Sequence, residues 1–164
     1  MVAQPAGDLN GLVVRVDDRL FHGQILYGWA NGWAEAIWLV HDIVAANSTE
    51  RALYEEQMEG VKGGILTIDE ALARYHSSGC SVGRCLLIVA SCVDLKRLID
   101  GGARPYEIHL ANLGEGEGKI SIADSVNLSK DDCNIIENLQ ADGLSICLRK
   151  LPQSETKPVV IPSE

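Results

Sequence analysis

Short apolar runs alternate along the chain with longer segments whose apolar residues recur every three or four positions. The runs have the length of buried strands, and the longer segments have the period of amphipathic helices. Strands are expected at residues 12–16, 36–40, 64–67, 85–90, 106–110 and 144–149, with two shorter ones around Ile120 and Val126. Helices are expected at residues 23–33, from Asn47, from Thr67 to about His76, around 95–99 and after Ser129. This alternation predicts a single three-layer α/β domain with a largely parallel central sheet and helices on both faces.

Local signals support several of these elements. Asn47 followed by Glu50, and Thr67 followed by Glu70, have the spacing of capping boxes at helix starts. The run at 85–90 has no polar alternation, which predicts a strand covered on both faces.

The chain has the length of one domain. Its 164 residues suit a single hydrophobic core. We assign the domain to residues 11–152 and expect flexible ends at 1–10 and 153–164. Proline at positions 152, 158 and 162 interrupts ladders and helices near the second end.

The charge of the chain excludes one class of partner. Fourteen Lys and Arg against 23 Asp and Glu give a net charge of −9. Such a field repels phosphate backbones and anionic lipid headgroups, so we expect no nucleic-acid binding.

Targeting and cysteine patterns indicate a cytoplasmic protein. The longest strongly apolar run, at 85–90, is far shorter than the roughly 20 residues of a membrane helix, and residues 1–10 lack the regions of a signal peptide. The five cysteines include no Cys-x-x-Cys, and three lie among Leu, Ile and Val, as buried reduced thiols do. They are Cys80, Cys85, Cys92, Cys133 and Cys147.

A cluster of polar side chains follows the first predicted strand, where ligands bind in open α/β sheets. Residues 17–24 read Asp-Asp-Arg-Leu-Phe-His-Gly-Gln. His22 is a nucleophile when neutral, and the positive end of the following helix discourages its protonation and attracts anions. Arg19 offers a planar fork that matches phosphate, and the backbone amides of Gly23 and Gln24 could hold phosphoryl oxygens.

The two carboxylates before this histidine leave alternatives open. Asp17 or Asp18 could fix the tautomer of His22 or hold Arg19 in place. The whole segment could also be an ordinary surface loop in which His22 caps a helix.

The string from Arg15 to Gln24 resembles the hallmark segment of the IIB component of the mannose/sorbose class of the bacterial sugar phosphotransferase system (PTS). Further similarities follow in order: Trp29 after the loop, a turn at 41–45, and a turn at 112–114. The resemblance covers residues 11–152.

The resemblance implies a phosphotransferase. His22 would accept a phosphoryl group from a phosphohistidine on a IIA protein and pass it to a sugar entering through a membrane permease of IIC and IID subunits. Arg19 would steady the phosphate, Asp42 would be polar support, and Asn112 would form a hydrogen-bonding wall. No metal or cofactor is implied, the partners would be separate polypeptides, and a homo-oligomer is possible because the family often associates.

Two residues depart from the family pattern. His41 replaces a small polar residue and is either a second imidazole near the phosphate or, as we favour, a side chain hydrogen-bonded at the end of its strand. Glu115 replaces the second glycine of the turn after Asn112, where a carboxylate would repel a phosphorylated partner that faced it.

Three other functions are compatible with parts of this sequence. A regulatory or interaction module would keep the loop without a transport role, and a histidine phosphatase would be expected to carry Arg next to His. A metal site would require His22, His41 and Asp42 to meet at one edge of the sheet.

Overall fold

The computed structural model describes residue 9, residues 11–77 and residues 83–163. The predicted flexible segment at 1–10 therefore lies outside the described residues, apart from Leu9, which is buried. Cys80 also lies outside them. Cys85, Cys92, Cys133 and Cys147 are buried, as expected. No helix within the described ranges is long and apolar enough to cross a membrane.

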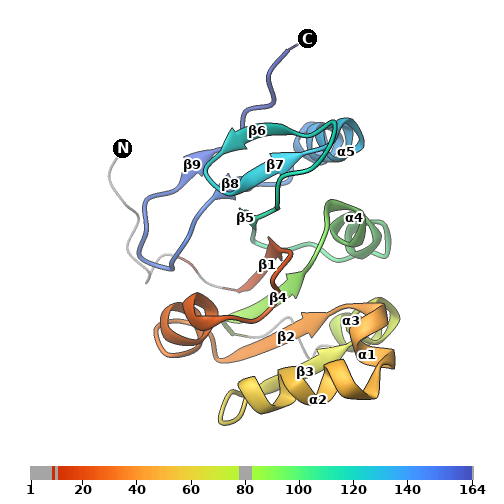
Figure 1. Cartoon of the computed structure of the whole chain (residues 1–164), viewed down its shortest axis with the longest axis vertical. Helices are drawn as coiled ribbons and strands as arrows, with labels where there is room; N and C mark the ends of the chain where they lie inside the picture. The colour runs from red at the N-terminus through yellow and green to blue at the C-terminus, as the bar shows by residue number, and fades with distance from the viewer. Residues whose placement is uncertain (1–8, 10, 78–82, 164) are drawn as a thin grey trace.

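Within the described residues, one seven-stranded sheet organises the fold (Figure 1). Its strand order is β3-β2-β4-β1-β5-β8-β9, and every pair is parallel except β8 with β9. The strands are β1 Leu12–Asp17, β2 Ala36–Val40, β3 Gly63–Leu66, β4 Cys85–Val89, β5 Glu107–Asn112, β8 Ile146–Leu148 and β9 Lys157–Pro158. A separate antiparallel hairpin is formed by β6 Ile120–Ala123 and β7 Val126–Leu128. The predicted largely parallel sheet is confirmed.

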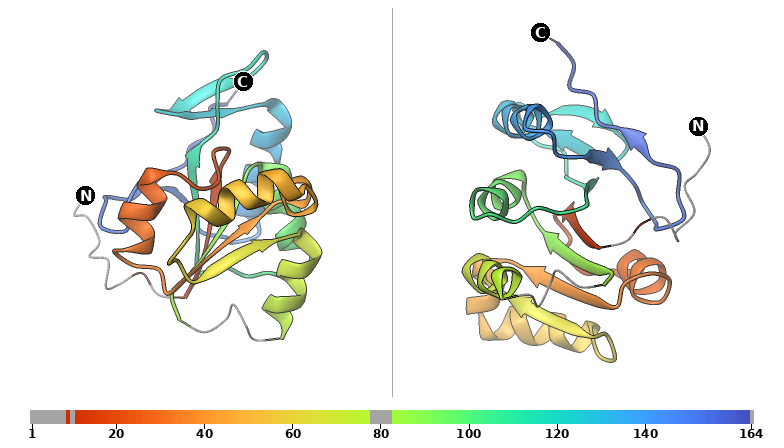
Figure 2. Two further views of the ribbon diagram at one scale, coloured as in Figure 1. Left: turned by 60° about the horizontal axis from the view of Figure 1, so that its bottom comes forward. Right: turned by 180° about the vertical axis from the view of Figure 1, so that it is seen from behind.

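Helices cover both faces of this sheet, also as predicted. They are η2 Ile25–Ala30, α1 Asp42–Ala46, α2 Ser48–Gln57, α3 Ile68–His76, α4 Cys92–Asp100 and α5 Lys130–Ala141. Buried residues of α3, α4 and α5 share one apolar cluster with one face, and those of η2 and α1 share a second cluster with the other face. Figure 2 (right) shows the three helices on one side and the orange-red η2 on the other.

Local sequence signals explain how these helices begin. At α3, Thr67 and Glu70 form both halves of the expected capping box. At α2, the Asn47 side chain accepts hydrogen bonds from two first-turn amides. The strand β4 is buried along its whole length, as its unbroken apolar run predicts.

The end of the chain differs from the prediction of a flexible tail. β9 pairs with β8, Val159 is buried, and the Gln140 side chain donates to the Val159 carbonyl at 2.9 Å. Pro158 lacks an amide proton, but it lies on an edge strand, where only one side of the backbone is paired. Burial of the apolar Val159 therefore holds this segment against the domain, although its prolines predicted a flexible tail.

Two helices also differ from the sequence reading. The helix expected at 23–33 winds as a π-helix over Ile25–Ala30, with its Asn31 cap amide bonded to the Leu26 carbonyl five residues back. The segment read as a turn at 41–45 begins a short helix, α1.

Candidate functional site

The loop between β1 and η2 holds His22 at the carboxyl end of the sheet. Leu20 has a φ of +58°, which is uncommon for a residue with a side chain, and its amide donates to the Asp17 carbonyl. Leu20 and Phe21 are buried and anchor the loop in the core below η2. The His22 side chain keeps 15% exposure, so its ring is held by the loop but reaches solvent.

Asp17 is the centre of the hydrogen bonds around this ring. Its side chain is completely buried. One oxygen, Oδ2, accepts from His22 Nε2 at 2.8 Å and from Asn112 Nδ2 at 2.9 Å. The other, Oδ1, accepts from the Arg19 amide at 3.0 Å. The structure thus joins three predicted site residues, Asp17, His22 and Asn112, in one cluster.

This geometry fixes the tautomer of neutral His22. An ionised carboxylate only accepts hydrogen bonds, so the nitrogen facing Asp17 must carry the proton. That nitrogen is Nε2. The lone pair of the neutral ring is consequently on Nδ1, the nitrogen that does not face Asp17.

Asp18 makes different contacts from its neighbour Asp17. Its Oδ2 accepts from the Gly114 amide at 2.7 Å, and its own amide donates to the Asn112 carbonyl at 2.9 Å. The question that the sequence left open is answered by these contacts. Asp17 holds the His22 ring, and Asp18 ties the loop to the turn after β5.

Arg19 is the exposed cation of the loop. Its side chain is 54% exposed, and its Nε lies 3.9 Å from Asp17 Oδ1. Arg19, Asp18 and Asn112 line a hollow of about 510 Å³, and Glu115 lies on the same wall. The carboxylate that departs from the family pattern therefore does face the space beside Arg19.

The helix start after His22 contributes one support that the sequence did not indicate. Gly23 and Gln24 form the first residues of the helical segment, with the amides of Ile25 and Leu26 bonded to the His22 carbonyl. The Gln24 side chain points to Arg15, whose Nη2 donates to Gln24 Oε1 at 3.1 Å.

Arg15 is the functional residue that sequence reasoning missed. It is completely buried, and its Nε lies 3.5 Å from Asp17 Oδ2. Its Nη1 donates to the carbonyls of Arg149 and Lys150 at 3.0 and 3.2 Å. Burial lowers the pKa of Arg15 to about 10, although the negative charge of Asp17 opposes the fall. The guanidinium thus stays charged at neutral pH and compensates the buried carboxylate.

A buried polar stripe continues from Arg15 across two further strands. Side chains alternate between the faces of a strand, so Arg15, Asp17, Glu107, His109 and Arg149 all lie on the face that η2 covers. A charged residue inside an apolar strand, as in Leu-Val-Val-Arg-Val-Asp at 12–17, is the one sequence signal that could have found this stripe.

Glu107 is the acceptor at the far end of this stripe. Its Oε1 accepts from His109 Nε2 at 2.8 Å, from the Cys147 thiol at 2.9 Å and from Arg149 Nε at 3.3 Å. Burial lowers the pKa of His109 to about 4 despite the attraction of Glu107. Burial alone would raise the pKa of Glu107, but these donors and the Arg149 charge together bring it to about 2.

The ligand atoms of Glu107, His109 and Cys147 also lie within 4.8 Å of one another, close enough for a metal ion. A cation there would lie beside the Arg149 guanidinium. Burial and the Glu107 contact raise the pKa of the Cys147 thiol, which keeps its proton. The donors fit a hydrogen-bonded core and do not fit a metal centre.

The predicted supporting role of Asp42 beside His22 finds no contact in the structure. Asp42 Oδ2 pairs with Arg97 at 2.8 Å, and Oδ1 accepts from the Ile68 amide at 2.9 Å. The amide and the guanidinium lower the pKa of Asp42 below its usual value. Because β4 lies between β1 and β2, Asp42 is held toward α3 and α4 instead of toward His22.

His41 is a helix cap. Its Nδ1 accepts from the Val44 amide at 3.2 Å at the start of α1, which is the reading we favoured. With His22 on Asp17 and Asp42 on Arg97, the metal site considered for these three residues is not assembled.

Comparisons with known proteins support the family that the loop resembles and the fold described above. The family described as "PTS system sorbose subfamily IIB component" matches residues 12–161. The mannose-specific EIIAB component of Escherichia coli K12 is 25% identical over 154 residues, which are 91% of this chain and 48% of that protein. The chain thus spans about half the length of these mannose-specific relatives. The fructose-specific EIIB component of Bacillus subtilis is also 25% identical, over 93% of this chain and 94% of its own.

Solved structures share the same architecture. The manxB protein from Thermoanaerobacter tengcongensis superposes with a TM-score of 0.79 at 25% identity, covering 90% of this chain and 92% of its own. The Escherichia coli N-acetylgalactosamine-specific IIB component 1 has a TM-score of 0.80 at 22% identity, covering 93% and 100%. The family match extends beyond the predicted boundary at 152 to include β9. The resemblance seen in the loop at 15–24 is confirmed, and the chain belongs to the sorbose subfamily of PTS IIB components.

Proposed function

We propose that this chain is the histidine phosphocarrier of a sugar phosphotransferase system, taking a phosphoryl group from a phosphorylated IIA protein onto His22. The hydrogen bond from His22 Nε2 to the buried Asp17 carries the proposal, because it leaves Nδ1 as the nucleophile. Membership of the IIB family supports the same role.

The transfer is an exchange between two imidazoles. The His22 Nδ1 lone pair forms a bond to phosphorus while the donor's N–P bond breaks, and the electron pair of that bond stays on the donor ring. His22 keeps its Nε2 proton, so its phosphorylated ring is positively charged and is stabilised by the Asp17 carboxylate 2.8 Å away. In-line transfer of this kind depends mainly on positioning and on charge neutralisation.

The remaining loop residues would serve the phosphoryl group itself. Arg19 is exposed and tethered near Asp17, so its guanidinium can turn toward phosphoryl oxygens. The backbone amides of Gly23 and Gln24, at the start of the helix, would attract the same oxygens. Asn112 acts through Asp17, which it holds in place at 2.9 Å.

The onward acceptor is proposed to be a sugar delivered by membrane permease subunits of the IIC and IID types, with transfer at the cytoplasmic side. The hollow beside Arg19 is open to solvent-borne partners and is lined by Glu115, so a donor meets both a cation and a carboxylate there.

The test is transfer of label from phosphoenolpyruvate through the general phosphotransfer proteins and a cognate IIA protein. Wild-type protein should gain acid-labile label, and His22→Ala should gain none. His41→Ala is the matched control, because His41 caps α1 and should leave labelling intact. Label that persists in His22→Ala would refute the assignment.

A further inference from the structure

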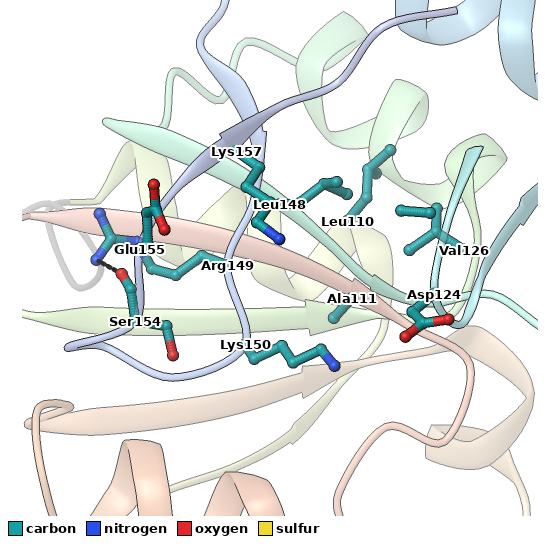
Figure 3. Close-up of a pocket in the computed structure, with 11 residues that line it drawn as sticks. Leu110, Ala111, Asp124, Val126, Leu148, Arg149, Lys150, Ser154, Glu155 and Lys157 are labelled. Carbon is teal, nitrogen blue, oxygen red and sulfur yellow. Dashed lines mark hydrogen bonds between the residues drawn. The ribbon is translucent and has the colours of Figure 1, made fainter. Parts of the chain in front are cut away.

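A second cavity, of about 360 Å³, lies between the ends of β5 and β8, the β6–β7 hairpin and the segment that leads into β9 (Figure 3). This volume falls within the range of small-molecule sites, roughly 300–1,000 Å³. One wall is apolar and is formed by Leu110, Ala111, Val126 and Leu148. A cavity of this kind can accept the apolar face of a compact ligand.

Two lysines give the cavity its charge. Figure 3 shows Lys150 and Lys157 reaching the cavity from different segments of the chain. Among the residues that the structure describes, neither ammonium group has an ion-pair or hydrogen-bond partner. In a chain of net charge −9, two such cations at one cavity point to an anionic ligand.

A third cation, the buried guanidinium of Arg149, lies beside the cavity. Arg149 lines the cavity at 2% exposure, and its Nη2 is buried without a hydrogen-bond partner among the described residues. Buried polar atoms of this kind are rare because they lose water without gaining a partner. Because this nitrogen has no exposed surface, it lies behind the cavity wall, and Arg149 adds only its positive charge to the surroundings of the cavity.

The cavity also has carboxylates, at its two ends in Figure 3. Asp124 is exposed on the hairpin turn, and Glu155 lies on the segment before β9. Carboxylates beside an anion site would repel a bare anion but accept hydrogen bonds from hydroxyl groups. The combination of cations, acceptors and an apolar wall therefore fits an anion that also carries hydroxyl groups.

We propose that this cavity binds a phosphate monoester of a sugar-sized polyol, with Lys150 and Lys157 on the phosphate and Asp124 on the hydroxyl groups. The site is distinct from His22 but adjoins it. Ala123 and Asp124 line both this cavity and the hollow beside Arg19. The Lys150 carbonyl also accepts a hydrogen bond from Arg15, which is the ion-pair partner of Asp17. A ligand in the cavity would therefore contact the segment that holds Arg15.

The test is a titration of the full chain, without phosphoenolpyruvate, by calorimetry and by backbone amide NMR shifts. The probes are a hexose 6-phosphate, the free hexose and inorganic phosphate. The hexose phosphate should bind saturably and shift the amides of Leu110, Ala111 and Leu148. Lys150→Ala and Lys157→Ala should each weaken binding by about tenfold or more, since each removes a charged hydrogen bond.

Two controls separate this site from the phosphocarrier function. Lys62→Ala removes an exposed lysine beyond the other edge of the sheet and should bind normally. His22→Ala should also bind normally, so the cavity and the His22 assignment can fail independently. Equal binding of inorganic phosphate would overturn the polyol assignment. Absence of saturable binding, or shifts confined to residues 17–24, would overturn the site.

Discussion

Asp17 and Asp18 are adjacent at the end of β1, yet they have different roles because they differ by one position along the strand. Asp17 is the last residue of β1, and its side chain falls on the face covered by η2, where His22 and Arg15 lie. Asp18 has left the strand and bonds the Gly114 amide. The sequence shows two equivalent carboxylates, and only the strand geometry distinguishes them.

Substitution of either aspartate by asparagine should have very different effects. Asp17→Asn should slow phosphoryl acceptance by roughly 10²–10⁴, because an amide no longer fixes the Nε2-protonated tautomer or stabilises a positively charged ring. Asp18→Asn should slow it by less than about tenfold. Single-turnover transfer from phosphorylated IIA protein measures both, and similar losses in the two variants would contradict the assigned roles.

Other residues of the site were beyond sequence reasoning for a physical reason. Arg15 bonds the carbonyls of Arg149 and Lys150, which are more than 130 positions away in the chain. Asp42 follows its strand as a supporting residue would, but Arg97 arrives from α4 and takes its carboxylate. The roles of Arg15 and Asp42 both depend on which distant element packs against them. The residues next to them in the sequence do not indicate which element that is.

At the scale of elements, the strands and helix caps could be predicted because their signals are local. Thr67 and Glu70 meet across one turn, and the β4 run needs only its own composition. The π winding of η2 was not predictable from apolar spacing. Its Trp29 ring nitrogen donates to the Lys150 carbonyl, so the winding accompanies packing against a distant segment.

The edge pairing of β2 with β3 supplies the second prediction. Gly63 has a φ of +133°, and a Cβ there would lie 1.7 Å from the Ile37 carbonyl oxygen. Gly63→Ala should therefore lower the free energy of unfolding by about 3 kcal/mol or more. Gly64→Ala is the matched control, since its Cβ would meet only the Trp38 ring at 3.4 Å and should cost about 1 kcal/mol or less. Denaturant unfolding with equal losses would contradict this account.

At the scale of the whole molecule, the buried polar stripe should make stability depend on acid. His109 has a folded pKa of about 4 against an ordinary value of 6.5, so the unfolded chain binds its proton first. The free energy of unfolding should fall by roughly 1–3 kcal/mol as pH drops from about 6.5 to about 4. Glu107, with a folded pKa of about 2 against 4.5, should extend the loss as pH falls below about 4.5.

Unfolding curves measured across this pH range test the third prediction. His109→Gln should flatten the slope between pH 6.5 and 4, whatever its effect on stability at neutral pH. His76→Gln, at the exposed end of α3, is the comparison variant that removes a histidine outside the buried polar stripe. An unaltered slope in His109→Gln would show that the proton uptake occurs elsewhere.

The fold class followed from the alternation of strands and helices, and the family from the loop at 15–24, because both are written in contiguous sequence. The net charge of −9 describes only the distant field. It does not reveal the local cations, Arg19 at the loop and Lys150 with Lys157 at the second cavity, which the fold assembles.

The central claim is that Asp17 directs the phosphoryl group to Nδ1 of His22. Its most direct test is a long-range ¹H–¹⁵N NMR spectrum of the protein labelled at histidine nitrogens, recorded before and after phosphorylation. We expect a proton on Nε2 of His22 before transfer and a phosphorus–nitrogen coupling at Nδ1 after it. A coupling at Nε2, or at any other histidine, would contradict it.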